Sequence, residues 1–311
     1  MLFKKALFVF AVMSSVFAFG QANTVELGVI TDNDSYTSSK NDKYYTNGLE
    51  IFYRFLNKAK KAEVNKKSTE FRIGQYIYNP RSISSEDIAT NDRPFAGYLF
   101  VEAGRSFFYQ NESVVKYHMQ IGNVGPNSFG KETQNFIHRL LNHKEATGWE
   151  HQIRNTVALQ SHVFYSKKLF PKLESKAIDF HFQSEADLGT IFTGASTGFL
   201  TRIAFKKLAP VYNSNLYGGA VGSNESEFYF YLAPSVNYQL YDATIQGSLF
   251  NDDSPVTYDL VPLRFNGEAG FKYRKNNLNL GYSFVYRGKE VNNDENTGYF
   301  YGSISISFLF K

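Results

Sequence analysis

Hydrophobic and polar residues alternate along much of the chain. In the segments 178–188, 278–287 and 300–310, apolar or aromatic side chains occupy nearly every second position. Alternation with a period of two residues places one set of side chains on each face of a β-strand. Segments of about ten residues match a tilted strand that crosses a membrane. The pattern therefore predicts an all-β protein, a transmembrane antiparallel β-barrel of about twelve strands in a single domain.

The connections between these segments differ in length. Residues 275–277 form a tight turn, whereas 251–255 and 288–297 are longer and rich in Asn and Asp. Short turns at one end and longer loops at the other are typical of outer-membrane barrels. The last strand carries Phe310 near its end, the usual aromatic assembly signal, here followed by a lysine. A soluble sandwich or lipocalin-like barrel is the alternative, for which we expect shorter strands and a less aromatic exterior.

The first residues predict export. Lys4 and Lys5 precede an uncharged apolar run at 6–19, which small residues follow. This order is typical of a signal peptide, and the run is shorter than the roughly 20 residues that a membrane-spanning helix needs. We therefore expect a signal peptide over 1–22, cleaved after Gly20 or Ala22, and a barrel domain over 23–311.

Composition narrows the class of protein. The chain has no cysteine, a formal net charge of +4, 17% aromatic residues and a mean hydropathy of −0.34. An exported protein without cysteine is held by its core and its hydrogen bonds, not by disulfides. The small net charge gives no reason to expect a nucleic-acid partner. Many aromatic residues in a chain of low hydropathy favour aromatic girdles that face lipid around a polar lumen.

One segment departs from the strand pattern. After a Gly-rich turn, apolar residues in 131–142 recur every three or four positions, which predicts a short helix in an extracellular loop. Gln134 and His138 are four residues apart and therefore share one face of this helix. Imidazole titrates near neutrality, so His138 is a candidate general base. A structural role is the alternative, and is the commoner one for a lone histidine on a helix.

Oxygen-bearing side chains cluster where the first predicted strand ends, at 32–34. Two carboxylates and an amide suit a hard cation such as calcium, although Asp and Asn are also ordinary turn residues. Residues 91–98 are typical of a turn that enters a strand, with Pro94 at its start. No His or Cys spacing indicates zinc, and no Gly-rich loop indicates phosphate binding.

Taken in order, these segments resemble the lipid A 3-O-deacylase family of Gram-negative outer membranes. The matching residues are Asn33-Asp34, Tyr45-Thr46-Asn47-Gly48, Asp92-Arg93-Pro94-Phe95-Ala96-Gly97, Gly125-Pro126-Asn127-Ser128, Gln134 and His138. The resemblance covers essentially the whole mature chain. It implies an outer-membrane barrel that depends on calcium and hydrolyses the 3′-linked acyloxyacyl chain of lipid A. It also places the active site near the outer leaflet, between the barrel wall and a loop helix.

The resemblance implies roles for individual residues. Asn33 and Asp34 match an Asn-Asp pair at the end of the first strand, with Asp34 helping to hold calcium. Thr46 matches a hydroxyl-bearing residue of the site. His138 matches the essential histidine, which would deprotonate a water molecule while calcium stabilises the oxyanion, as in the mechanism of secreted phospholipase A2.

Further matches concern the substrate. The resemblance implies that this is lipid A, the lipid part of lipopolysaccharide, and that the protein is surrounded by outer-membrane lipids. Arg81 lies where the family has basic residues near the substrate phosphate, and Gln134 is assigned to substrate binding. Glu145 matches a further acidic position. We expect a monomer.

Two other functions are compatible with a barrel. One is a passive porin-like or catalytically inactive barrel, which would not need Asn33-Asp34, Thr46 and His138 together. The other is an outer-membrane phospholipase with a serine nucleophile. The chain has no Gly-x-Ser-x-Gly motif, although membrane-barrel lipases need not use it.

Overall fold

The computed structural model describes residues 24–37, 44–59, 62–82, 90–140, 142, 144–171 and 175–311. The expected signal peptide lies outside these residues. Within them, no helix has the length and apolar character needed to cross a membrane.

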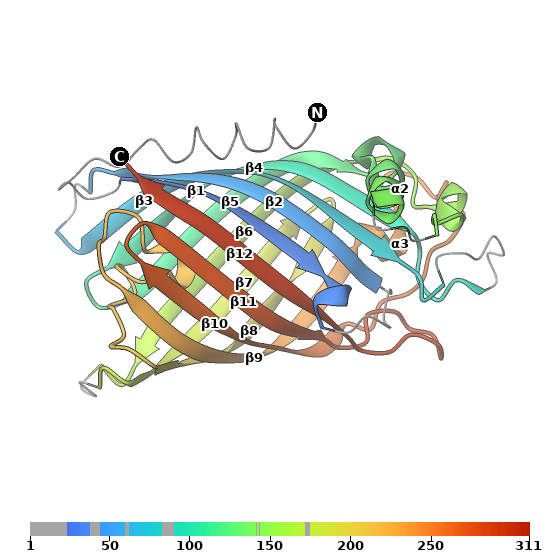
Figure 1. The fold of residues 1–311 in the computed structure, drawn as a ribbon. Coiled ribbons are helices and arrows are strands. Elements are labelled where there is room, and N and C mark those ends of the chain that lie inside the picture. Colours follow the sequence, from blue (N-terminus) through green and yellow to red (C-terminus); the bar gives the residue numbers. More distant parts are fainter. Residues whose placement is uncertain are drawn as a thin grey trace, which may run out of the picture.

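Antiparallel strands form a closed barrel in which each strand pairs with its neighbours in sequence and β1 pairs with β12 (Figure 1). The twelve strands are β1 (Val25–Asn33), β2 (Tyr44–Asn57), β3 (Val64–Asn79), β4 (Ala96–Tyr109), β5 (Ser113–Val124), β6 (Thr156–Leu169), β7 (Ile178–Gly189), β8 (Phe192–Ala204), β9 (Glu227–Asp242), β10 (Leu263–Lys275), β11 (Leu278–Arg287) and β12 (Tyr299–Phe310). The predicted fold class is therefore confirmed. Several strands are longer than the ten residues expected, reaching 16 in β3 and β9.

Short helices lie in the connections. They are η1 (Asp34–Tyr36), η3 (Pro126–Ser128), α2 (Gly130–Leu140), η4 (Gly148–His151), η5 (Leu216–Gly218) and α3 (Ala243–Gln246). The helix expected over 131–142 is α2. We call the end of the barrel where β1 begins and β12 stops the terminal end; α2 and α3 lie at the opposite, loop end (Figure 1).

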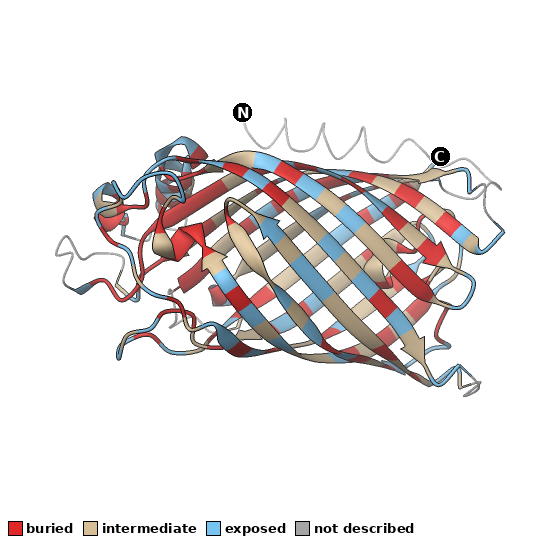
Figure 2. Cartoon of the chain, turned by 180° about the vertical axis from the view of Figure 1, so that it is seen from behind, coloured by how far each residue is buried: buried red, intermediate tan, exposed pale blue. Residues whose placement is uncertain are grey.

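Alternate residues of each strand face outward. On β2, Leu49, Ile51 and Tyr53 are 40–49% exposed, whereas the residues between them are buried or nearly so. A similar alternation of more and less exposed positions runs along most of the other strands (Figure 2). The exposed side chains are largely aliphatic and aromatic, so they form the apolar outer surface that a lipid bilayer requires.

The lumen is lined by paired charges. Arg54 lies between two glutamates, with its guanidinium nitrogens 2.6 Å from Glu26 and 2.5 Å from Glu70. Arg72 reaches Glu50 and Glu70, each at 2.5 Å. Buried charges are tolerated where opposite charges and hydrogen bonds compensate for lost hydration. These ion pairs also link neighbouring strands across the interior.

One connection contradicts the expectation of short turns at the terminal end. Residues 205–226 form a long segment there that folds into the barrel. Its apolar side chains, Leu208, Val211 and Leu216, pack against inward-facing residues of the wall in one buried cluster. The Lys66 Nζ of β3 donates to the carbonyl of Gly219 at 2.7 Å. We call residues 205–226 the plug. The plug folds into the barrel because its apolar side chains are buried there rather than left in solvent.

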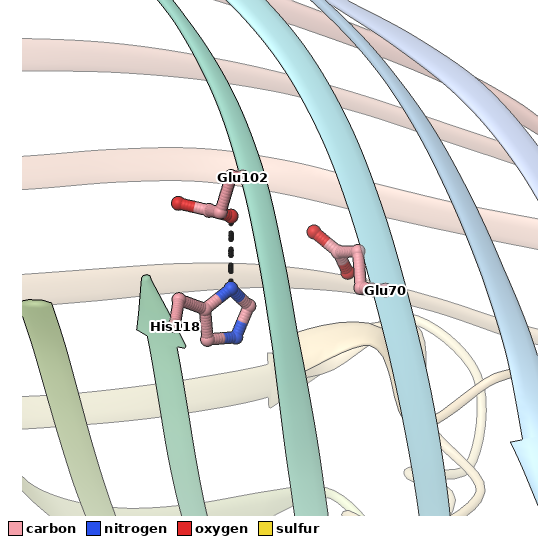
Figure 3. A group of neighbouring side chains, drawn as sticks. All are labelled: Glu70, Glu102 and His118. Carbon is pink, nitrogen blue, oxygen red and sulfur yellow. Dashed lines mark hydrogen bonds and ion pairs between the residues drawn. The ribbon is translucent and has the colours of Figure 1, made fainter. Parts of the chain in front are cut away.

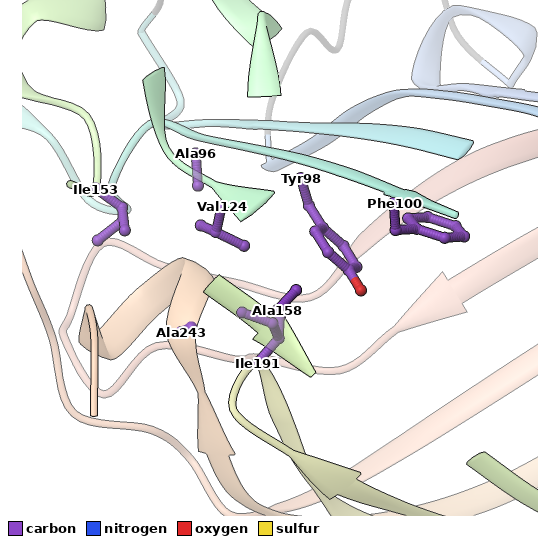
Figure 4. Packing of buried hydrophobic residues seen from close by; sticks show 8 residues of the cluster. All are labelled: Ala96, Tyr98, Phe100, Val124, Ile153, Ala158, Ile191 and Ala243. Atoms are coloured by element: carbon purple, nitrogen blue, oxygen red, sulfur yellow. The ribbon is translucent and has the colours of Figure 1, made fainter. Parts of the chain in front are cut away.

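Apolar residues also fill part of the lumen near the loop end. This cluster joins wall residues to the loops and to α3 (Figure 4). Its members are Ala96, Tyr98, Phe100, Val124, Ile153, Ala158, Ile191 and Ala243. The cluster anchors the segment 125–155, which carries α2, to the barrel wall.

Candidate active site on the outer wall

Two of the candidate residues, Asn33 and Thr46, lie on the lipid-facing side of the barrel wall. Val29 of β1 is 41% exposed, so alternation directs Asn33, four residues on, to the same outer face. A β-bulge between Tyr45 and Asn47 inserts Thr46 as an extra residue in β2. The Thr46 hydroxyl accepts a hydrogen bond from Asn79 at 3.2 Å, and Asn79 shares its face with the exposed Ile73. Bulges often redirect a side chain beside a functional site, which is what this one does.

Hydrogen bonds hold the end of β1 and the start of the next loop. Asn33 Nδ2 donates to Asn47 Oδ1 at 2.6 Å, across the β1–β2 pair. The Asn33 carbonyl oxygen Oδ1 accepts from the backbone N–H of Ser35 at 2.7 Å and also from the Ser35 hydroxyl. Asn33 thereby caps η1, whose first residue is the buried Asp34. Asn33 is therefore held beside Asn47, which follows Thr46 in β2, and the buried Asp34 comes next at the loop end of β1.

The outward-facing side chains at this place are covered, unlike those further along the wall. Thr46 and Asn79 are 0% exposed and Ile77 is 1% exposed. Ile77 packs with Phe95, Ala146 and Trp149 of the loops. The helix α2 contacts β3 and β4, beside which it lies in Figure 1. The loop segment that begins with α2 thus lies on the outer wall and covers this patch.

The close approach of α2 depends on two glycines. A Cβ atom added to Gly97 of β4 would lie 3.1 Å from the Cα of Gly130 and 2.1 Å from the Ser128 hydroxyl oxygen. Gln75 of β3 donates from Nε2 to the Ser128 carbonyl at 2.5 Å, which ties the start of the helix to the wall.

Gln134 and His138 share the inner face of α2, as their spacing predicts, and both are buried. Gln134 Oε1 accepts a hydrogen bond from the Trp149 indole at 2.7 Å. His138 Nδ1 lies 2.5 Å from the carbonyl oxygen of Lys144. A carbonyl can only accept, so the proton belongs on Nδ1 of the neutral ring. Nε2 is then the basic nitrogen of His138.

The remaining candidates lie apart from this patch. The Arg81 side chain is 67% exposed and its guanidinium lies 3.6 Å from Glu295, while its backbone N–H donates to Asp92 at 2.8 Å. Glu145 is also largely exposed and pairs with Arg139 at 2.8 Å. Neither side chain has a described contact with Thr46, Gln134 or His138.

The segment 91–98 fits its structural interpretation. The Asp92 carboxylate accepts from the hydroxyl of Tyr44 at 2.7 Å, which holds the turn against β2. Arg93 is fully buried and its Nε lies 3.6 Å from Glu290. Tyr258, in the loop after α3, donates its hydroxyl proton to the Asn91 carbonyl, and burial raises the pKa of Tyr258.

Sequence reasoning missed two contributors to the patch. Asn79 ends β3 directly before a proline and bonds Thr46. Trp149, the single tryptophan of the chain, is fully buried and holds Gln134. The sequence does contain a signal for Trp149, because a single tryptophan in a polar loop indicates local packing around it.

The oxygen donors at the rim fit a calcium ion. Asp34 would supply a carboxylate, and Asn33, Thr46 and Asn47 carry the amide and hydroxyl oxygens that could join it. Hard cations such as calcium prefer such oxygen ligands, and this set contains no imidazole or thiolate that would favour a softer metal.

Comparison with known proteins identifies the family. The model of the family described as outer membrane protein LpxR matches residues 6–310. The chain belongs to the LpxR family. LpxR from Salmonella typhimurium has a similar structure, with a TM-score of 0.73 and 19% identity over 92% of this chain and 100% of that chain. A search of curated proteins found no match.

Other outer-membrane barrels are more distant from this LpxR-family chain. The β domain of the Bordetella autotransporter BrkA has a TM-score of 0.51 and 10% identity, covering 93% of this chain and 100% of its own. At such identities the likeness concerns the fold alone. Family and fold together place this LpxR-family protein in the outer membrane as a closed barrel.

Proposed function

We propose that this protein is an outer-membrane esterase that removes the 3′-linked acyloxyacyl chain from lipid A. The observation that carries the proposal is the covered patch on the outer wall at the loop end, where Asn33 and Thr46 lie and where α2, the helix that carries His138, contacts β3 and β4. The longer loops of outer-membrane barrels face the cell exterior. A site on the lipid-facing wall at this end would meet lipids of the outer leaflet, where lipid A resides.

His138 would act as the general base. Its Nδ1–H donates to the Lys144 carbonyl, which orients the ring and leaves Nε2 as the atom that takes a proton from water. A positioned histidine base contributes about 10²- to 10⁴-fold to the rate of such a reaction. The attack of this water on the ester carbonyl would release the acyloxyacyl chain as a carboxylic acid.

Asp34 and its neighbours would hold the divalent ion and orient the ester. Calcium bound there would supply positive charge that stabilises the negative oxygen formed during hydrolysis. Gln134 uses its oxygen to hold Trp149, while its buried Nε2 has no hydrogen-bond partner within the described residues. We assign this Nε2 a hydrogen bond to the bound substrate. The Arg81 side chain is exposed at the rim, so its guanidinium could leave Glu295 and bind a phosphate of the lipid instead.

A passive pore is disfavoured by the interior. The plug fills the lumen at the terminal end, and the apolar cluster of Figure 4 fills part of it near the loop end. A conducting barrel needs a continuous aqueous path, which this packing opposes.

The test is mass spectrometry of lipid A from cells that express the protein or its His138→Ala variant. We expect loss of the 3′-acyloxyacyl group with the wild type and its retention with the variant. His151→Ala is the matched control, since His151 lies in the same loop and the ion pair described for its side chain is with its neighbour Glu150. Both variants should show the shifted gel mobility of a folded barrel. Identical spectra with the full acyl set from wild type and His138→Ala would refute the proposal.

A further inference from the structure

Two groups of histidine and carboxylate side chains lie inside the lumen, away from the outer wall. One comprises Glu70, Glu102 and His118 (Figure 3), and the other His162, Glu185 and Asp187. In each group, the nitrogen and oxygen atoms that could bind a metal lie within 4.8 Å of one another. Their surroundings differ in charge, and this difference decides which of them is a candidate metal site.

The first group is already neutralised by arginines. His118 Nδ1 bonds Glu102 at 2.8 Å, and Arg72 lies 2.5 Å from Glu70 and 3.5 Å from Glu102. Arg54 adds a second guanidinium, 2.5 Å from Glu70. A metal ion there would be repelled by both guanidinium groups and would have to displace them. This group is therefore a structural ion-pair network.

The second group has a histidine with one ring nitrogen bonded to a carboxylate and the other without a hydrogen-bond partner among the described residues. His162 of β6 and Asp187 of β7 are direct partners in the strand register, and Nδ1 of His162 bonds the Asp187 carboxylate. Nε2 of His162 is buried and has no hydrogen-bond partner within the described residues. In protein metal sites, a carboxylate commonly accepts the proton of one ring nitrogen while the other nitrogen binds the metal. The pair has this arrangement.

Glu185 supplies an available carboxylate beside this ring. It lies two residues before Asp187 on the same inward face of β7. Among the residues that the structure describes, no hydrogen bond or ion pair engages it. His162, Glu185 and Asp187 all line a lumenal cavity of 490 Å³. The group therefore has both an unpaired anionic ligand and space for water molecules.

The charge of the cavity favours a cation. Six carboxylates and two guanidinium groups line it: Asp32, Glu185, Asp187, Asp242, Glu268 and Glu290 against Arg264 and Arg287. Arg264 is already engaged, 3.2 Å from Glu290. The lining is thus a mainly acidic surface that carries one imidazole, whereas guanidinium groups surround His118 and its carboxylates.

We propose that His162 and Glu185 bind a divalent transition-metal ion of the zinc class in the lumen. His162 Nε2 and the Glu185 carboxylate are the protein ligands, water in the cavity completes the coordination, and Asp187 positions the imidazole. An imidazole together with carboxylates suits zinc, cobalt or nickel, whereas calcium and magnesium prefer all-oxygen sites. This site is separate from the oxygen-rich rim on the outer wall and does not depend on the esterase function.

The test uses the folded full-length barrel in detergent, stripped of metal and titrated with Co²⁺, followed by its visible absorption. Zn²⁺ then competes for the site in a second titration. We expect one equivalent of Co²⁺ to bind, with visible bands that differ from those of the hydrated ion. Glu185→Gln and His162→Gln should each weaken binding by at least about tenfold, and Asp187→Asn by about 10- to 100-fold. Glu185→Gln retains the His162–Asp187 pair, so it should fold even if the other variants do not.

Two controls make the assignment specific. His118→Gln removes the arginine-neutralised histidine, and His138→Ala removes the imidazole of the outer wall; both should bind Co²⁺ like the wild type. Wild-type binding by Glu185→Gln and His162→Gln would overturn the proposal. Loss of the Co²⁺ bands in His118→Gln or His138→Ala would also overturn the proposal, because the metal ligands would then lie elsewhere.

Discussion

Gly97→Ala should separate the activity of the protein from the stability of its barrel. The added Cβ would lie 2.1 Å from the Ser128 hydroxyl oxygen, where ordinary contacts begin at 3.4 Å. The hydroxyl can rotate away only by giving up its 2.6 Å hydrogen bond to the Gly125 carbonyl. The Cα of Gly130, at 3.1 Å, is backbone and must itself retreat by a few tenths of an ångström. The start of α2 is therefore lifted from the wall.

The expected cost falls on catalysis. Overpacking of this kind costs about 1–3 kcal/mol locally, and displacement of a catalytic group by about 1 Å can cost about 10²-fold in rate. We expect deacylation of lipid A to fall by about 10- to 100-fold while the heat-modified gel mobility of the barrel is unchanged. Trp149 is the single tryptophan and packs beside Gly130, so its fluorescence should shift to the red and report the movement independently of activity.

Gly267→Ala is the matched control. A Cβ at Gly267 would meet only one atom, Cε1 of Phe265, at 3.9 Å, which is an ordinary contact. This variant should keep both the rate and the fluorescence of the wild type. If Gly97→Ala behaved like Gly267→Ala in both measurements, the inference that α2 must lie tightly on the wall would be wrong.

Three further predictions follow from the site and the lumen. Chelation of calcium should abolish deacylation, with recovery on adding Ca²⁺ but not Mg²⁺, and Asp34→Asn should raise the Ca²⁺ concentration needed; full activity of the chelated wild type would contradict the calcium assignment. Arg54→Leu leaves buried glutamates without their shared partner and should lower stability by about 3–5 kcal/mol in a urea unfolding titration, whereas Arg105→Leu on the exposed face should have little effect. Replacement of 207–225 by a short Gly-Ser turn should raise single-channel conductance in planar bilayers, and unchanged conductance would show that the plug does not limit passage.

The alternation of side chains was sufficient to predict the barrel, because the period of two residues is a local property of β-strands. It also predicted that Gln134 and His138 share a face of α2, since helical spacing is equally local. The plug was missed because 205–226 carries no such period and is held by contacts with distant strands. Its place inside the barrel depends on the closed fold.

The site was only partly predictable for the same reason. Asn33 and Thr46 were candidates by resemblance, but the lipid-facing position of Thr46 depends on a bulge that pairing with β3 reveals. Asn79 contacts Thr46 from the neighbouring strand, a relation that needs the register of β2 and β3. Arg81, two residues further on, was matched by resemblance to basic residues near the substrate phosphate, and its guanidinium lies 3.6 Å from Glu295.

The extra residue in β2 has a consequence for how such a site can arise. Without the bulge, strict alternation would turn either Thr46 or its neighbour Asn47 toward the lumen, and β2 would contribute only one of these two polar side chains to the outer wall. Insertion of one residue gives two adjacent polar side chains on the hydrophobic side, while Tyr45 still reaches Asp32 inside at 2.8 Å. The insertion of a single residue can thus add a polar site to the outer wall of an existing barrel without changing the packing of its interior.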